Sequence, residues 1–183
     1  MYRFFTIRPD ASPRTALEQW YSTSPLGKRL REQLNKDMGT ILDQWFGYNL
    51  LVIGPNTDIP ISEMTRVRRV LQVLDREQQL RKGYTGVYAH DEELPLETES
   101  VDVVVVLNAL DLSAHPHQLL REVHRVLTPH GHLLIVGTNG WSISGLWHRL
   151  VRLVTGYRSE HARAPGLRRL EDWLTLLEFA VAP

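Results

Sequence analysis

The chain has 183 residues, 43% of them hydrophobic, a length and composition that suit one folded domain with a core of its own. Its 21 basic and 21 acidic side chains give a formal net charge of zero, which excludes a general electrostatic attraction to nucleic acid or to an anionic membrane. The lack of cysteine excludes disulfides, thiolate nucleophiles, zinc-thiolate sites and iron–sulfur clusters, and it favours a cytoplasmic protein.

The first 48 residues predict an arm followed by helices. Residues 1–14 contain two prolines and mixed polarity, which is typical of a loose arm. We expect neither secretion nor membrane spanning, because the start lacks a signal-peptide pattern and no run of eighteen apolar residues occurs. From residue 15 to 45 the apolar side chains recur at helical intervals that "STSPLG" interrupts, which predicts two helices joined by a proline turn.

Residues 49–91 contain two predicted strands and one ambiguous stretch. "NLLVIG" (49–54) is a short apolar run that ends in glycine, as expected of a buried parallel strand. The stretch over 61–82 fits either one helix or a short helix followed by a strand, because its apolar residues satisfy both periods. "TGVYAHD" (85–91) predicts a further strand, and an acidic loop follows it.

The segment "VDVVVVLNAL" (101–110) predicts a central strand. Its four successive valines cannot alternate between core and water, so both faces of the strand must be covered. "HPHQLLREVHRVLTPHG" (115–131) predicts a helix that ends in a turn at "TPHG", and "HLLIVGTN" (132–139) predicts the next strand. A strand, a helix and a strand in this order form a βαβ unit, so we expect a parallel sheet.

Three segments together carry a family resemblance: "AHDEELPLETESVDVVVVLNAL", "LLREVHRVLTPHGHLLIVGTN" and "RLEDWLTLLEFAV". They resemble the class I S-adenosylmethionine-dependent methyltransferases, in particular the type 11 branch that includes quinone-biosynthesis C-methyltransferases. The resemblance implies a Rossmann-like three-layer α/β/α domain with a mostly parallel sheet over 49–183, behind an N-terminal arm and helical cap over 1–48. The family's sheet also favours the short helix followed by a strand over 61–82.

The chain ends where the family continues. Family members finish with an antiparallel hairpin, whereas this sequence stops at "LEFAVAP", so we expect a C-terminally incomplete fold without the final antiparallel strand. The open strand edge then has two explanations: the sequence is a fragment, or a homodimer contact covers the edge.

The resemblance implies S-adenosylmethionine as the cofactor and assigns its binding residues by position. In the family a GxGxG loop follows the first strand, a carboxylate at the end of the second binds the ribose, an acidic residue after the third faces the adenine, and the end of the fourth borders the methyl group. The matching positions are Gly54, Asn56 and Asp58 in the loop, Asp75 for the ribose, Asp91 and Glu92 for the adenine, and Asn108 beside the methyl group.

Each of these assignments has an alternative. Only Gly54 keeps a glycine in the loop; Asn56 and Asp58 tolerate left-handed backbone, so the turn can form, but their side chains add bulk. Asp75 fits an ordinary solvated charge, and Asp91 fits a residue that caps a turn.

The catalytic candidates follow the predicted central strand. Asp111, His115 and His117 lie near the expected methyl position and would act as a general base if the acceptor must lose a proton; an exposed first helical turn is the alternative for His117. The pairs "HPH" and "HGH" have no third ligand at a metal-site spacing, so we expect no metal.

The acceptor is predicted from residues 141–169, which contain six arginines, one glutamate and two tryptophans. The resemblance places this region on the acceptor side, where a small anionic or amphipathic molecule would fit; the alternative is a core-facing helix with solvated arginines. Nucleic-acid modification draws only on these arginines, and we do not expect it. The sequence therefore predicts a methyltransferase of small molecules, and its alternative is an inactive pseudo-methyltransferase that serves as a binding or regulatory partner.

Overall fold

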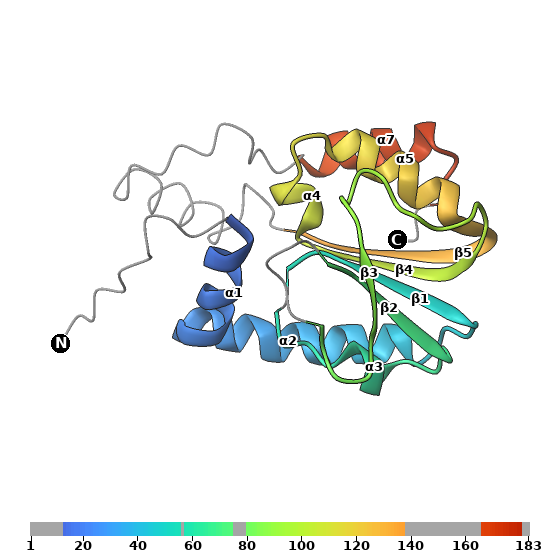
Figure 1. The fold of residues 1–183 in the computed structure, drawn as a ribbon. Coiled ribbons are helices and arrows are strands. Elements are labelled where there is room, and N and C mark those ends of the chain that lie inside the picture. The colour runs from blue at the N-terminus through green and yellow to red at the C-terminus, as the bar shows by residue number, and fades with distance from the viewer. Residues whose placement is uncertain (1–12, 56, 75–79, 138–165, 181–183) are drawn as a thin grey trace.

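The computed structural model describes residues 13–55, 57–74, 80–137 and 166–180. Five parallel strands form one sheet in the order β3-β2-β1-β4-β5. The strands are β1 (Asn49–Ile53), β2 (Arg69–Leu74), β3 (Thr85–Tyr88), β4 (Val101–Leu107) and β5 (Leu127–Val136). Helices α5 (Pro116–Val126) and α7 (Leu167–Leu176) cover one face, and α2 (Pro25–Leu42) and α3 (Ile61–Met64) cover the other (Figure 1). The predicted three-layer Rossmann-like fold is confirmed.

The four valines of β4 explain why the sheet has a core on each side. Val104 and Val106 belong to the cluster that packs against α5 and α7, whereas Val103 and Val105 belong to the cluster under α2 and α3. All four side chains are fully buried. Alternate residues of a strand face opposite sides, so an uninterrupted apolar run is what a strand between two helix layers requires.

The ambiguous stretch over 61–82 contains a short helix and a strand. One turn of helix, α3, is followed by β2, which pairs in parallel with β1 from Asn49↔Arg69 to Val52↔Gln72. This confirms the favoured alternative. Asp75 comes directly after β2 and lies outside the described residues.

The turn predicted at residues 128–131 has a different form in the structure. Strand β5 begins at Leu127, immediately after α5, and pairs there with Val101. The next pair between β4 and β5 is Val103 with His132, so the register shifts between these two pairs. Residues 128–131 of β5 therefore form a bulge. The prediction of a separate turn before the strand was therefore wrong, because Leu127 already has extended backbone and pairs with β4.

The far edge of the sheet is formed by β5, and within the described part of the chain no antiparallel strand pairs with it. The segment 141–169 falls almost entirely outside the described residues, so its acceptor-side assignment stays a prediction.

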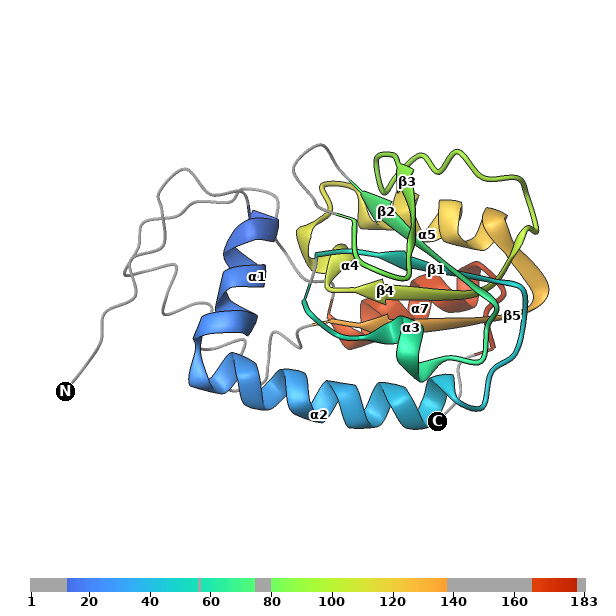
Figure 2. The ribbon, with the colours of Figure 1, turned by 60° about the horizontal axis from the view of Figure 1, so that its bottom comes forward.

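Helix α1 (Pro13–Thr23) stands at a steep angle to α2 and lies at the end of the sheet where α4 (Ala109–Leu112) follows β4 (Figures 1 and 2). Only Ser24 separates the two helices, and its side chain accepts a hydrogen bond from the backbone N of Gly27 at 3.4 Å, which caps α2. A side chain at Gly27 would overlap the Trp20 carbonyl oxygen, so glycine allows the two helices to meet closely. Thus α2 anchors α1 beside the carboxyl ends of the strands.

Candidate functional site

The loop after β1 begins with a glycine that the sheet itself requires. Gly54 has φ +132°, and a Cβ atom there would overlap the carbonyl oxygen of Leu107 at the end of β4. Glycine is the residue that adopts this conformation without strain and leaves room for the neighbouring backbone. It therefore allows the ends of β1 and β4 to approach each other at the predicted cofactor loop.

The rest of this loop presents a carboxylate and a buried hydroxyl. Asp58 has left-handed backbone, with φ 57°, and its carboxylate lies 3.5 Å from the guanidinium groups of Arg31 on α2 and of Arg81. Thr57 is 2% exposed, and its hydroxyl has no hydrogen-bond partner among the described residues. Because burying an unpaired hydroxyl costs free energy, a ligand that hydrogen-bonds to the hydroxyl would remove this cost. Asn56 lies outside the described residues.

The carboxylate of Asp91 is buried and already paired. Its side chain is 8% exposed and forms an ion pair with Arg14 of α1, whose side chain is 18% exposed. A carboxylate that is this well buried stays ionised only beside a cation or several donors. The structure thus joins α1 to the residue predicted to face adenine.

Glu92 faces a different element from its neighbour. One of its carboxylate oxygens accepts from the Ser113 hydroxyl at 2.8 Å and from the backbone N of His115 at 3.1 Å. Glu92 therefore ties the loop after β3 to the start of α5. Its cofactor role stays a prediction.

Asn108 is the centre of a hydrogen-bond chain at the end of β4. It is buried, has left-handed backbone with φ 49°, and its backbone N donates to Val136 of β5 at 2.6 Å. The Tyr21 hydroxyl donates to its Oδ1 at 3.2 Å, and its Nδ2 donates to Asp111 Oδ2 at 3.2 Å. Burial and the nearby charge of Asp111 raise the pKa of Tyr21 to about 12, so the hydroxyl keeps its proton at neutral pH.

Two of the three catalytic candidates, Asp111 and His115, have different surroundings. Asp111 is partly buried and belongs to the Tyr21–Asn108 chain, whereas His115 is exposed at the N-cap of α5, where its backbone N also donates to Ser113 Oγ at 3.0 Å. The structure therefore brings Asp111, but not the His115 side chain, to the strand end. Tyr21 and Arg14 complete the site, and sequence reasoning missed both: Tyr21 had only a helical apolar pattern, and Arg14 fell in the predicted arm.

Comparison with known proteins gives the family. The family model described as a methyltransferase domain matches residues 57–135. The uncharacterised protein YafS of Escherichia coli K12 is 32% identical over 177 residues, which are 96% of this chain and 71% of YafS. The chain belongs to the type 11 class I methyltransferases. The family implies S-adenosylmethionine as the cofactor.

Solved structures share the fold of this chain at low sequence identity. A Thermotoga maritima protein described as a possible histamine N-methyltransferase is 17% identical with a TM-score of 0.66, over 88% of this chain and 80% of that one. A protein described as a methyltransferase, in a complex with the Haloferax volcanii activator Trm112, is 14% identical with a TM-score of 0.67, over 91% and 77% of the two chains.

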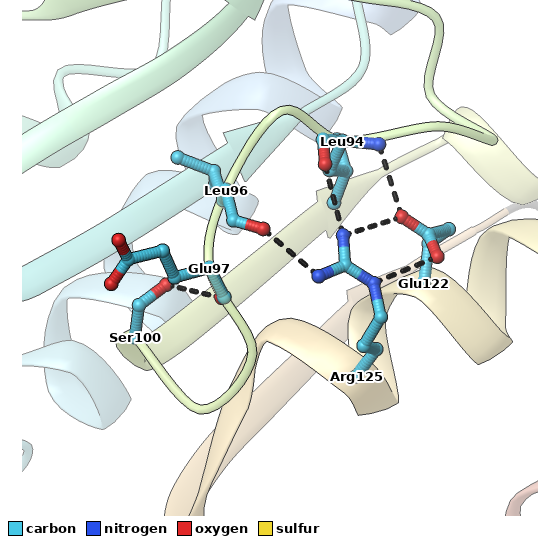
Figure 3. A network of polar contacts seen from close by, with 6 residues as sticks. All are labelled: Leu94, Leu96, Glu97, Ser100, Glu122 and Arg125. Atoms are coloured by element: carbon cyan, nitrogen blue, oxygen red, sulfur yellow. Dashed lines mark hydrogen bonds and ion pairs between the residues drawn. The ribbon is translucent and has the colours of Figure 1, made fainter.

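The loop that carries Asp91 is held against α5 by Arg125 (Figure 3). Its guanidinium donates to the carbonyl oxygens of Leu94 and Leu96, each at 2.9 Å, while Glu122 accepts from the Leu94 backbone N at 3.1 Å. The hydrogen bond from Arg125 holds the pKa of Glu122 below its usual range. This network fixes the loop without using any residue of the predicted site.

Some histidines of the chain pack against aromatic rings. His132 stacks on Trp45 with 4.7 Å between ring centroids, and His117 meets Trp173 edge-on. Among the residues described, no group of three or more metal-ligating side chains comes together. In the same part of the chain no helix has both the length and the apolar character needed to cross a membrane.

Proposed function

We propose that this chain transfers the methyl group of S-adenosylmethionine to a small-molecule acceptor in the cytoplasm. The observation that carries the proposal is the position of three predicted groups at the carboxyl ends of three strands of the same parallel sheet. These are the Gly54 turn after β1, the Asp91 carboxylate after β3 and Asn108 after β4. Open parallel sheets bind ligands at this end of their strands.

Each group has chemistry that suits one part of the cofactor. The Gly54 to Asp58 turn would hold the methionine portion, with the Thr57 hydroxyl as an additional partner. Asp75 would accept from the ribose hydroxyls, and Asp91 from the adenine amine, since a carboxylate accepts from either. Bound S-adenosylmethionine supplies a methyl group on a positively charged sulfur, and the protein orients the acceptor and excludes water.

The acceptor side contains the candidate base. Asp111 is hydrogen-bonded to Asn108 and would take a proton from an acceptor that must lose one. The arginines and tryptophans of residues 141–169 favour an anionic or amphipathic acceptor.

The experiment is a calorimetric titration of S-adenosylmethionine and of its demethylated product, S-adenosylhomocysteine, into the full chain. We expect micromolar binding. The Asp75→Asn variant should bind at least about 1 kcal/mol more weakly, which is the scale of one hydrogen bond to a charged group. Asp37→Asn, which changes an exposed carboxylate on α2, is the matched control and should bind like the wild type.

Two results would contradict the proposal in different ways. Binding that Asp75→Asn leaves unchanged would remove Asp75 from the site. Absence of binding by every protein would favour the pseudo-methyltransferase, and the search would move from acceptors to protein partners.

A further inference from the structure

Helix α1 contacts the predicted cofactor site at two points. Arg14 pairs with Asp91 after β3, and the Tyr21 hydroxyl donates to Asn108 after β4. The two α1 residues are seven positions apart, about two helical turns, so they project from one face of the helix. One helix face thus engages two of the polar groups that the proposed function gives to the cofactor.

The ion pair is the stronger of these contacts. Asp91 has 8% of its side chain exposed, and Arg14 supplies the positive charge that an ionised, buried carboxylate needs. The adenine amine is a neutral hydrogen-bond donor, so its contact with Asp91 would replace only part of the interaction between Asp91 and Arg14. With 8% of its side chain exposed and Arg14 paired to it, the carboxylate of Asp91 offers little free surface to a ligand.

We propose that the docked helix α1 and the bound cofactor exclude each other. Arg14 and Tyr21 hold Asp91 and Asn108 in a closed state, and the cofactor binds after α1 withdraws. This inference rests on the proposed function. The measured dissociation constant is then the intrinsic one divided by the open fraction, so weakening the closed state tightens binding.

Two matched variants test the exclusion. Arg14→Gln removes the charge that pairs with Asp91, and Arg29→Gln makes the same change on the exposed surface of α2. In calorimetry with S-adenosylhomocysteine, we expect Arg14→Gln to bind more tightly than the wild type, by up to about tenfold for a closed state populated about nine to one. Arg29→Gln should match the wild type.

Hydrogen exchange supplies an independent readout. Amides of α1 should exchange faster in ligand-free Arg14→Gln than in the ligand-free wild type, and S-adenosylhomocysteine should speed their exchange in the wild type. Thermal melting first checks that each variant is folded. If Arg14→Gln is not folded, Tyr21→Phe takes its place, because it loses the hydroxyl that donates to Asn108 and keeps the ring.

The outcomes separate the two proposals. Equal or weaker binding by Arg14→Gln, or slower exchange of α1 when the ligand binds, would overturn the exclusion and make α1 a wall of the occupied site. No binding by any variant would refute the proposed function and this inference with it.

Discussion

Gly54 connects the first strand to the predicted cofactor loop in a conformation that side chains do not tolerate. Its φ is +132°, and the space for a Cβ is taken by the backbone of Leu107. Both obstacles are in the backbone, so rotation of a side chain cannot relieve them.

We expect Gly54→Ala to lower the free energy of unfolding by about 2–4 kcal/mol, the combined scale of backbone strain and overpacking. Gly39→Ala is the control, because a Cβ there meets only the Met64 side chain at 4.0 Å and replaces a glycine inside α2. It should raise the free energy by roughly 0.5–1 kcal/mol. Urea unfolding followed by circular dichroism measures both; equal stability of Gly54→Ala and wild type would show that the loop relaxes.

For single residues, the sequence predicted which polar groups lie at the strand ends, but it did not predict which residues contact them. Asn108 and Asp91 could be placed because each follows a recognisable strand. Asn108 and its partner Tyr21 are 87 positions apart in the chain, and Asp91 and its partner Arg14 are 77 positions apart. Both contacts depend on the direction in which α1 extends from its junction with α2. No local pattern encodes that direction, so it could not be predicted.

Helix α5 holds the loop after β3 through Arg125 and Glu122 (Figure 3). The pKa of Glu122 is lowered chiefly by the hydrogen bond from Arg125. A carboxyl group whose folded-state pKa is depressed contributes stability above its ordinary pKa, and that contribution is lost as the pH falls through the folded value.

We therefore expect wild type to exceed Glu122→Gln in stability by about 1 kcal/mol at pH 7, a modest value because the two side chains are 21% and 35% exposed. The difference should shrink as the pH falls below ~4.3, the ordinary glutamate pKa. Urea unfolding between pH 7 and 3 measures it, with Glu97→Gln as the exposed control. A difference that is constant over this range would assign the effect to shape and not to charge.

The elements themselves were largely predictable from periodicity. The four valines indicated a strand between two layers, and "STSPLG" marked the break between α1 and α2. The β5 bulge was not predictable, because "TPHG" has the composition of a turn whether or not the flanking residue pairs with β4.

At the scale of the whole molecule, the predicted division into residues 1–48 and residues 49–183 stays a prediction. Leu42 of α2 is fully buried in the core that includes β1 and β4, and Leu119 of α5 is fully buried in the core on the opposite face. Both cores use residues of the same strands, so we expect the two faces to unfold together.

Leu42→Ala and Leu119→Ala should each lower the free energy of unfolding by about 2–5 kcal/mol, the cost of a cavity in a packed core. Far- and near-ultraviolet circular dichroism should give one coincident urea transition for each variant. Two separated transitions in Leu42→Ala would mean that α2 folds as an independent unit.

The junction at Ser24 also determines how α1 can move. Because α1 is joined to α2 through a single residue, the proposed opening would be a rotation of α1 about Ser24. With a rise of 1.5 Å per helical residue, Arg14 lies about 15 Å from the pivot and Tyr21 about 4.5 Å, so Arg14 travels roughly three times as far. A small rotation would therefore break the ion pair between Arg14 and Asp91 first, and a larger rotation would then separate Tyr21 from Asn108.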